Sequence, residues 1–420
     1  MKLYVITPIY ATTTEGDGAT PLVHYFAREW VKMGHEVTAF NFMARFPRPY
    51  YWVGKMFQHQ LNSRLGMLVP THSPRDEDFK AEGVKVIRRT MTKYKPHTEY
   101  TSTNINYALS IIRNECEKNG VPDYFIGHWD SPCMDILPKL KQEFGKPIVI
   151  VLHSNQFCFE KRHGDYAVEV LKQFDVIGFR SRAAQENFER NYFKPAKSFI
   201  CYSGVSEAFL NAGEELEKSF DEPIKNFIYT GSLIARKHSI ELYEALCKAY
   251  PEGDFLIKYV GDGAERANIE ANYAAKKLGK VEFTGRIPRE SVIEHLKQAD
   301  VFAMISKNEV FGLVYIEAMA LGLIPIGSRN EGIDGIIVDG VNGFLCEAGN
   351  VGELVDIITK IKKMPKKELQ KISLAARKTA LDFSDSRVAE KYIDEIKINL
   401  KSATKPLNVL LACTCPLLLN

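Results

Sequence analysis

Two glutamates separated by seven residues, Glu309 and Glu317, carry the strongest sign of chemistry in this chain. Glu309 precedes a Phe-Gly turn, and Glu317 lies inside the helical pattern of residues 313–320. Gly312 lets the backbone approach a ligand closely, and the unpaired N–H groups at the start of the helix favour an anion. A phosphate-bearing ligand held there would have a carboxylate on either side, each able to accept hydrogen bonds from sugar hydroxyls. An ordinary buried βα unit fits the same spacing, so the glutamates alone leave both interpretations open.

Two adjacent cations follow an expected strand and a glycine turn. Gly231 permits close backbone approach, Lys237 supplies a compact positive charge, and Arg236 can make a bidentate contact with phosphate oxygens. These residues predict a diphosphate site at the start of the next helix. An Arg-Lys pair is also typical of a solvated surface, and this alternative stays open for the pair taken alone.

Further polar or glycine-rich turns follow expected strands and should face one edge of a parallel sheet. Gly18 belongs to a loop whose amides can cradle an anion, although the GxGxxG spacing is absent. Gly285 and Arg286 form a turn whose backbone can contact a nucleobase, and a plain tight turn is the alternative. His153 and His128 each follow a strand, which favours a place near the cleft over a purely structural role.

The elements that must position these residues alternate between short apolar strands and helical patterns. This alternation predicts βαβ units and parallel sheets with helices on both faces. The pattern stops in the polar, acidic stretch 208–224 and then resumes. The sequence therefore predicts an α/β protein with a first domain at 1–207, a linker at 208–224 and a second domain from 225, with a cleft at the carboxyl ends of the strands.

Composition limits the classes to which the protein can belong. A chain of 420 residues is too long for one ordinary core, which also favours two domains. The formal net charge of +3, with acids and bases balanced, argues against nucleic acid as a partner. Eight cysteines without a CxxC or Cys/His cluster suggest neither disulfides nor zinc and fit a reducing cytoplasm. The first residues are expected to form a buried strand rather than a signal peptide, and no apolar run predicts a membrane-spanning helix.

Taken together, these residues resemble the retaining GT-B glycosyltransferases of glycosyltransferase family four, the group 1 glycosyltransferases. The most specific element is the E-x7-E motif with its surroundings, residues 309–322, after a second Rossmann-like series. Supporting pieces are residues 34–37, 149–153, 203–205, 260–263, 340–345 and 383–384. The resemblance covers the chain to about Lys397.

This resemblance implies a GT-B fold, in which two Rossmann-like, doubly wound domains face a central cleft. Acceptor binding would belong to residues 1–207 and nucleotide-sugar binding to residues 225–385. A C-terminal helix at 386–400 would cross back to the first domain, and residues 401–420 are expected to form a disordered tail.

The resemblance also implies residue roles, with His153, Glu309 and Lys237 as the catalytic set. Glu309 would contact hydroxyls of the donor sugar, and Glu317 would bind the ribose of the nucleotide. Lys237 with Arg236 would neutralise the charge that grows on the diphosphate as the glycosidic bond breaks. The other expected donor-binding residues are Gly18 near the phosphate, Gly285 and Arg286, and the backbone of Phe311, Gly312 and Leu313. No metal or cofactor is implied, because cations and helix dipoles can do the work of a divalent ion.

Three positions depart from the family pattern. Ser232 stands where an arginine is usual, and Arg236 is the expected substitute. Ser203 stands where Asn is usual before Gly-Val, and Gly335 occupies a commonly acidic position, with Asp334 beside it. These departures concern the donor rather than the class of enzyme.

The expected reaction moves a sugar from a UDP- or GDP-sugar to a glycan or lipid-linked acceptor with retention of configuration, in cell-surface polysaccharide or glycolipid biosynthesis. No protein nucleophile is expected, because the departing phosphate oxygen can take the acceptor proton on the same face. Both glutamates lie on one loop-helix segment, which disfavours a two-carboxylate hydrolase. A nucleotide-sugar epimerase and a catalytically inactive sugar-binding partner are the alternatives, whereas a missing GxGxxG disfavours an NAD-dependent oxidoreductase.

Residues 43–66 form a stretch without a single acid, in which cations alternate with aromatic residues. Such a surface suits an anionic membrane interface or a lipid-linked acceptor. A loop packed on the domain with solvated cations is the alternative. The cytoplasm is the expected location, with peripheral contact at the inner face of the membrane. The residues concerned are Arg45, Arg48, Lys55, Arg64, Phe46, Tyr50, Tyr51, Trp52 and Phe57.

Overall fold

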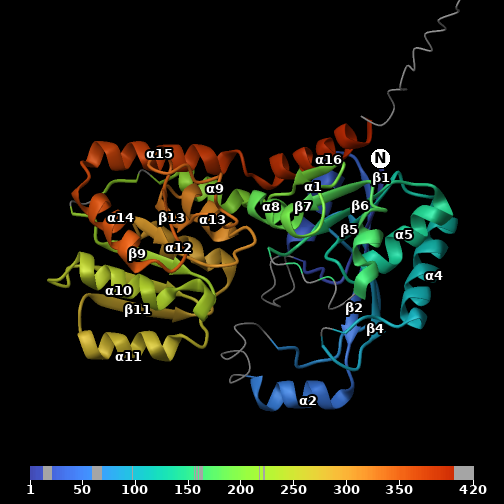
Figure 1. Cartoon of the computed structure of the whole chain (residues 1–420), viewed down its shortest axis with the longest axis horizontal. Coiled ribbons are helices and arrows are strands. Elements are labelled where there is room, and N and C mark those ends of the chain that lie inside the picture. Colours follow the sequence, from blue (N-terminus) through green and yellow to red (C-terminus); the bar gives the residue numbers. More distant parts are fainter. Residues whose placement is uncertain are drawn as a thin grey trace, which may run out of the picture.

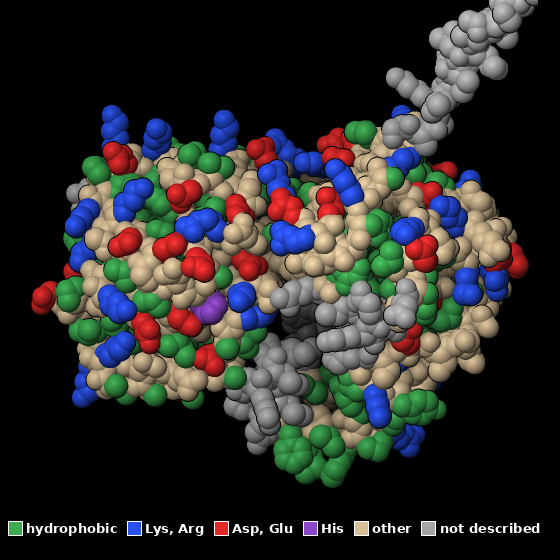
Figure 2. Space-filling view, viewed as in Figure 1, with side chains coloured by type: hydrophobic (Ala, Val, Ile, Leu, Met, Phe, Trp, Pro, Cys, Tyr) green, Lys and Arg blue, Asp and Glu red, His purple; other side chains and the backbone are tan. Residues whose placement is uncertain are grey.

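The computed structural model describes residues 1–12, 21–58, 69–96, 98–155, 157, 159, 164–216, 218–220 and 223–401. These residues form two α/β domains that lie side by side (Figure 1). The space-filling view is hollowed between the domains (Figure 2). Among the expected site residues, Gly18 lies outside the described residues, as do residues 59–66 and, apart from Lys401, the expected tail.

The first domain contains an eight-stranded sheet in the order β3-β4-β2-β1-β5-β6-β7-β8. Only β3 runs antiparallel, against β4. Its strands are β1 (Lys2–Thr7), β2 (Glu36–Arg45), β3 (Glu77–Ala81), β4 (Val84–Thr92), β5 (Tyr124–His128), β6 (Ile148–Leu152), β7 (Val176–Phe179) and β8 (Ser198–Ile200). Its helices are α1 (Leu22–Lys32), α2 (Arg48–Met56), α4 (Ser102–Asn119), α5 (Cys133–Phe144), α7 (Ala167–Leu171) and α8 (Arg182–Asn191), with a 3-10 turn at Gly164–Tyr166.

The second domain contains a parallel six-stranded sheet in the order β11-β10-β9-β12-β13-β14. The strands are β9 (Asn226–Thr230), β10 (Leu256–Val260), β11 (Lys280–Gly285), β12 (Val301–Ala303), β13 (Ile324–Ser328) and β14 (Phe344–Cys346). The helices are α9 (Glu207–Glu214), α10 (Ser239–Ala249), α11 (Arg266–Lys276), α12 (Val292–Lys297), α13 (Leu313–Ala320), α14 (Val351–Lys363) and α15 (Lys366–Leu381), with 3-10 turns at Ala235–Lys237 and Arg289–Ser291. The strand order reverses between β9 and β12, and ligands of doubly wound sheets bind at such a switch point.

The central strands are apolar on both faces because helices cover both sides of each sheet. Every residue of β6, with the sequence Ile-Val-Ile-Val-Leu, is buried. Residues of β9 and β12 lie in the core of the second domain together with residues of α10 and α13. Continuous apolar runs of this kind are typical of parallel strands buried on both faces.

The last described helix, α16 (Asp385–Lys401), crosses from the second domain back to the first (Figure 1). Trp30 of α1 donates a hydrogen bond from Nε1 to the carbonyl of Ala389 at 2.9 Å. The ring of Tyr392 packs edge-on against Phe26 and Trp30, with centroid distances of 5.2 and 5.1 Å. The predicted fold, two doubly wound domains with a returning C-terminal helix, is therefore confirmed.

Residues 208–224 differ from the expected linker, because most of the described part belongs to the second domain. Helix α9 lies there and packs on α13, where a Cβ on Gly213 would come within 1.9 Å of the carbonyl oxygen of Ala320. Phe209, Phe220 and Ile224 are buried in the second-domain core. Their apolar side chains outweigh the acidic composition that suggested a linker.

Candidate active site

The switch point of the second sheet brings together three residues expected to bind the donor. The 3-10 turn with Arg236 and Lys237 follows β9, and Glu309 follows the neighbouring strand β12. The Nζ atom of Lys237 donates a hydrogen bond to Oε2 of Glu309. The Nη1 atom of Arg236 lies 3.7 Å from the same oxygen. Residues 72 positions apart in sequence thus form one charged cluster at the carboxyl ends of the strands.

Glycines around this cluster allow two strand-ending turns to touch. A Cβ on Gly261 would lie 2.0 Å from the carbonyl oxygen of Gly231, and one on Gly263 would lie 2.2 Å from that of Leu233. Gly231 itself has a φ of 148°, which strains other residues. The Gly-Asp-Gly sequence after β10 is therefore required for packing beneath the cation turn.

Lys237 is a buried cation, with 9% of its surface exposed. Burial lowers the pKa of Lys237, and the carboxylate of Glu309 opposes this shift. Ser306 also donates a hydrogen bond from Oγ to Oε2 of Glu309 at 3.3 Å. A diphosphate that binds Lys237 must therefore share the ammonium N–H groups with Glu309, in surroundings where charge interactions are strong.

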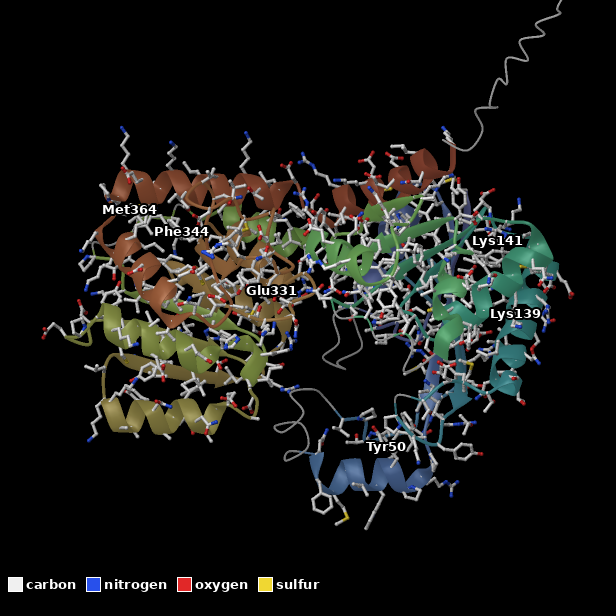
Figure 3. The ribbon with its side chains drawn as sticks, in the orientation of Figure 1. Tyr50, Lys139, Lys141, Glu331, Phe344 and Met364 are labelled. Atoms are coloured by element: carbon white, nitrogen blue, oxygen red, sulfur yellow. The ribbon has the colours of Figure 1, made fainter. Side chains whose placement is uncertain are left out.

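Glu331 holds the loop that carries Glu309, and sequence reasoning missed it. Its Oε2 accepts a hydrogen bond from the backbone N–H of Glu309 at 2.7 Å, and the N–H of Gly332 donates to the carbonyl of Glu309 at 2.9 Å. Figure 3 places Glu331 at the edge of the second domain nearest the first. Its position just after β13, the neighbour of β12, is the sequence signal that could have indicated this role.

The Phe-Gly turn has the conformation that the sequence predicts. Gly312 has a φ of 79° and precedes α13, which begins at Leu313. The ring of Phe311 packs against Tyr202 of the first domain at 5.7 Å, and Cζ of Arg180 lies 5.7 Å from its centroid. The side chain of Phe311 therefore faces the first domain, which is compatible with a backbone role at the ligand.

His153 lies on the first domain and belongs to a chain of ring contacts. It stacks on Trp129 at 3.9 Å, and its Nε2 lies 2.9 Å from Nδ1 of His128. The Nε2 of His128 lies 3.4 Å from the hydroxyl of Tyr392 in the returning helix. Burial, followed by Arg180, lowers the pKa of His128 to about 3, and burial with Arg180 and His128 lowers the pKa of His153 well below its usual value. Both imidazoles are therefore neutral at physiological pH.

A neutral buried histidine makes the fold less stable in acid. The unfolded chain binds a proton on His128 near pH 6.5, whereas the folded chain does not until pH falls to about 3. Acidification from pH 7 to pH 5 is therefore expected to cost about 2 kcal/mol of unfolding free energy for this histidine alone. Urea unfolding of wild type and His128→Gln at both pH values checks the prediction. The variant should lose about 2 kcal/mol less than wild type, and equal losses would contradict a neutral His128.

Asn155 joins the two predicted halves of the site across the domain boundary. Its Nδ2 donates a hydrogen bond to the backbone carbonyl of Glu309, and its Oδ1 is buried without a hydrogen-bond partner among the described residues. The segment that carries His153 therefore touches the loop that carries Glu309. Asn155 was not among the expected site residues, although it lies two positions after His153 at the same strand end.

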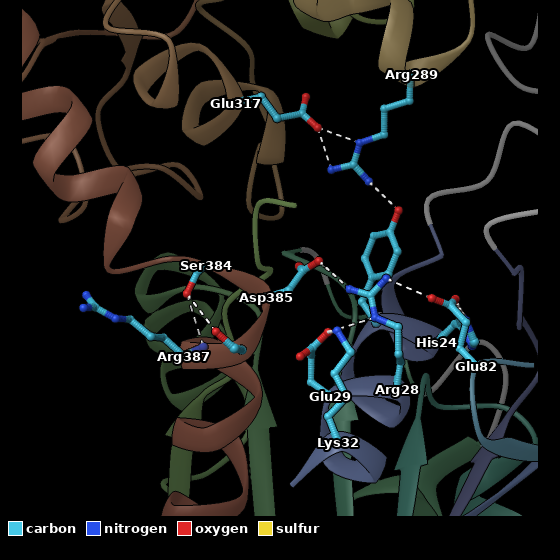
Figure 4. Close-up of polar contacts among 12 residues, drawn as sticks. His24, Arg28, Glu29, Lys32, Glu82, Arg289, Glu317, Ser384, Asp385 and Arg387 are labelled. Atoms are coloured by element: carbon cyan, nitrogen blue, oxygen red, sulfur yellow. Dashed lines mark hydrogen bonds and ion pairs between the residues drawn. The ribbon is translucent and has the colours of Figure 1, made fainter. Parts of the chain in front are cut away.

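Glu317 lies on the buried side of α13, with 4% of its surface exposed. Its Oε1 accepts a hydrogen bond from Nε of Arg289 and forms an ion pair with this residue, which sequence reasoning missed (Figure 4). Gly285 and Arg286 lie a few residues before Arg289 in the sequence. Gly285 has a φ of 70° and no atom within 4 Å of a hypothetical Cβ, and Arg286 is exposed. Arg289 therefore follows the expected nucleobase turn in the sequence and contacts the expected ribose acid.

Residues 214–379 match the glycosyl transferases group 1 family. An uncharacterized glycosyltransferase from Methanocaldococcus jannaschii is 25% identical over 258 residues, which cover 60% of this chain and 69% of that protein. The sulfoquinovosyl transferase SQD2 from Arabidopsis thaliana is 30% identical over 320 residues, which cover 71% of this chain and 59% of that protein. The crystal structure of Anabaena HepE in complex with UDP has a TM-score of 0.64 at 16% identity, and the match covers 95% of this chain and all of that one, a likeness of fold.

Proposed function

We propose that this chain, whose residues 214–379 match the group 1 glycosyltransferases, transfers a sugar from a UDP- or GDP-sugar to a glycan or lipid-linked acceptor with retention of configuration. The observation that carries the proposal is the cluster of Lys237, Arg236 and Glu309 at the switch point of the second sheet. Its cations suit a diphosphate, and its carboxylate suits sugar hydroxyls. The UDP bound by HepE, which has the same fold, supports a nucleotide donor.

The proposed reaction needs no protein nucleophile. The bond between the anomeric carbon and the diphosphate oxygen breaks, and Lys237 and Arg236 stabilise the negative charge that grows on the diphosphate. The acceptor hydroxyl adds to the anomeric carbon on the face that the diphosphate leaves, and its proton passes to the departing phosphate oxygen. Glu309 holds the sugar, and the neutral His153 donates or accepts a hydrogen bond at the sugar without changing charge. The cations perform the neutralisation that a divalent ion performs elsewhere, so we propose that transfer requires no metal.

A screen of UDP- and GDP-sugars by thermal shift tests the donor proposal. One nucleotide class is expected to raise the melting temperature by several degrees, because a ligand at a hundred times its Kd stabilises the folded state by about 2.7 kcal/mol. The selected donor is then incubated with and without glycan or lipid-linked acceptors, and with and without EDTA. We expect the donor to be consumed only when an acceptor is present. We also expect the same rate with and without EDTA. Conversion of the donor to an isomer without an acceptor would favour an epimerase, and stabilisation without turnover would favour an inactive sugar-binding protein.

Helix α2 carries an apolar surface with basic residues beside it. Trp52 is 64% exposed, and Val53, Met56 and the following Phe57 are also exposed. We call these four residues the α2 patch. Figures 1 and 3 show α2 projecting from the first domain, with Tyr50 labelled on it, and the corresponding surface in Figure 2 is hydrophobic. Arg48 and Lys55 on the same helix are exposed.

The α2 patch supports a peripheral membrane role, which would bring a lipid-linked acceptor to the first domain. Aromatic and aliphatic side chains enter the headgroup region, and neighbouring cations attract anionic lipids. Among the described residues, no helix combines the length and the apolar composition that a membrane span requires. Tyr51 fixes the helix on the domain, because its hydroxyl accepts a hydrogen bond from the N–H of Phe46 at 2.9 Å.

Liposome co-sedimentation tests the membrane proposal. Wild-type protein is expected to sediment with vesicles that contain anionic phosphatidylglycerol and to stay in the supernatant with pure phosphatidylcholine. A Trp52→Ser/Met56→Ser variant should lose most of this binding. Leu374→Ser is the matched control, because Leu374 is 63% exposed on α15, away from the α2 patch. Binding that ignores lipid charge, or that survives loss of Trp52 and Met56, would contradict the proposal.

A further inference from the structure

Arg289 forms an ion pair and one hydrogen bond with the carboxylate that the proposed function assigns to the ribose. Its Nε donates a hydrogen bond to Oε1 of Glu317 at 2.7 Å, and its Nη2 lies 2.5 Å from the same oxygen. The contact is shielded from solvent, because only 5% of the Glu317 side chain and 25% of the Arg289 side chain are exposed. Burial of a carboxylate without a partner costs free energy, and the guanidinium of Arg289 offsets that cost.

Both contacts lie on one oxygen of Glu317, which leaves the other for a ligand. Among the described residues, no donor contacts Oε2 of Glu317. A carboxylate oxygen has two lone pairs and can accept hydrogen bonds from two neighbouring hydroxyls, such as those of a ribose. The arrangement therefore orients Glu317 with one oxygen held and one oxygen available.

The same guanidinium also reaches the first domain (Figure 4). Its Nη1 donates a hydrogen bond to the hydroxyl of Tyr25, on α1, at 3.3 Å. The Tyr25 ring has two cations near it, with Cζ of Arg289 5.7 Å and Cζ of Arg28 5.0 Å from its centroid. Arg28 in turn donates from Nη2 to Oδ2 of Asp385 at 3.1 Å.

Asp385 is the first residue of α16, where the chain crosses between the domains. Its backbone N–H donates to the carbonyl of Val205 at 3.1 Å, and Val205 pairs with Ser384 in an isolated bridge. The two chain segments that connect the domains therefore meet at Asp385. A continuous series of polar contacts runs from this crossing point through Arg28, Tyr25 and Arg289 to Glu317.

We propose that Arg289 is a positioning residue for the nucleotide, which orients the carboxylate of Glu317 and, through Tyr25, makes this grip depend on contact between the two domains. The inference rests on the proposed function, because it takes Glu317 as the ribose acid. Without Arg289, the buried carboxylate would lack its counter-charge and the contact that fixes its orientation. A carboxylate that is not held in place aligns poorly with the ribose hydroxyls, so nucleotide affinity would fall.

Calorimetric titration with UDP and with GDP tests the proposal on wild type, Arg289→Met, Glu317→Ala and the double variant. Arg289→Met is expected to weaken binding of the preferred nucleotide by about tenfold or more, the loss of one charge-assisted interaction. Because Arg289 acts through Glu317, the double variant should bind within about threefold of Glu317→Ala alone. Arg289→Lys keeps the positive charge on a single donor group, so it should bind the nucleotide more tightly than Arg289→Met does. A merely structural role of Arg289 would not predict this recovery.

Two further variants separate the parts of the proposal. Tyr25→Phe removes only the hydroxyl and should weaken nucleotide binding by about threefold, since one neutral hydrogen bond is lost. Arg387→Ala is the control, because the side chain of this exposed arginine pairs with the exposed Asp382. Wild-type affinity in Tyr25→Phe would overturn the link to the first domain.

The outcomes for Arg289 and for the proposed function are distinguishable. If Glu317→Ala weakens binding and Arg289→Met does not, Arg289 is not a positioning residue and the ribose role of Glu317 stands. If neither variant weakens binding, the ribose role itself fails. An additive loss in the double variant would show that Arg289 contacts the nucleotide independently of Glu317, which also overturns the proposal.

Discussion

Replacement of Lys237 with Ala is expected to lower the rate of sugar transfer by about two to three orders of magnitude, with the fold preserved. Lys237 is the buried cation at the switch point, and it would stabilise the charge that appears on the diphosphate as the glycosidic bond breaks. The loss of one preorganised donor to such a charge costs roughly 3 to 4 kcal/mol of transition-state stabilisation. Steady-state kinetics with the selected donor measures the effect, and a fall in kcat greater than the rise in KM is the expected pattern.

A loss of activity in the Lys237 variants must be distinguished from an effect of damage to the fold. Loss of Lys237 leaves the partly buried Glu309 with Arg236 at 3.7 Å as its remaining cation. A Lys237→Met/Glu309→Gln variant removes both charges, and its unfolding free energy should be close to that of wild type while transfer stays abolished. Lys280→Ala, at an exposed position at the start of β11, is the matched control and should retain wild-type turnover. Near-normal turnover in folded Lys237→Ala would remove Lys237 from the phosphate site.

Replacement of Glu317 with Ala is expected mainly to weaken nucleotide binding, by roughly 10- to 100-fold. Hydrogen bonds to a charged group contribute about 1.5 to 3 kcal/mol each, and the ribose would lose its carboxylate partner. Calorimetry with the preferred nucleotide measures the change in Kd. The effect on kcat at saturating donor should be smaller, because Glu317 would contact the nucleotide rather than the reacting carbon.

A conservative variant and a surface control sharpen this second prediction. Glu317→Gln keeps the size of the side chain and one oxygen, so its loss of affinity should be smaller than that of the alanine variant. Glu294→Ala, on the exposed face of α12, should bind the nucleotide like wild type. Unchanged affinity in a folded Glu317→Ala protein would rule out the ribose role, whatever the effect of Arg289 variants.

The amino-acid sequence by itself determined the class of fold and the sheet edge on which the candidate site residues lie. Alternation of apolar strands with helices dictates parallel sheets, and parallel strands end at the same edge. Residues that follow strands, such as Lys237, Glu309 and His153, could therefore be assigned to the cleft from local sequence alone. The start of α13 at Leu313 could also be predicted locally, because a glycine turn precedes the helical pattern.

The tertiary structure decided which of these residues touch. Pairing of Lys237 with Glu309 depends on β9 and β12 being neighbours, which is a property of strand order. The contacts of Asn155 with Glu309 and of Arg289 with Tyr25 depend on how the two domains face each other. Local sequence does not encode these placements, because they follow from long-range packing of the whole sheet and of the returning helix.

The contrast between local sequence and tertiary packing also applies to residues 208–224 and to the pair Glu309 and Glu317. Acidic composition suggested a linker, but burial of Phe209, Phe220 and Ile224 requires a core that only the folded second domain provides. The two glutamates of one sequence motif likewise have different partners in the folded protein. Glu309 pairs with Lys237 of the same domain. Glu317 is held by Arg289, which also contacts Tyr25 of the first domain.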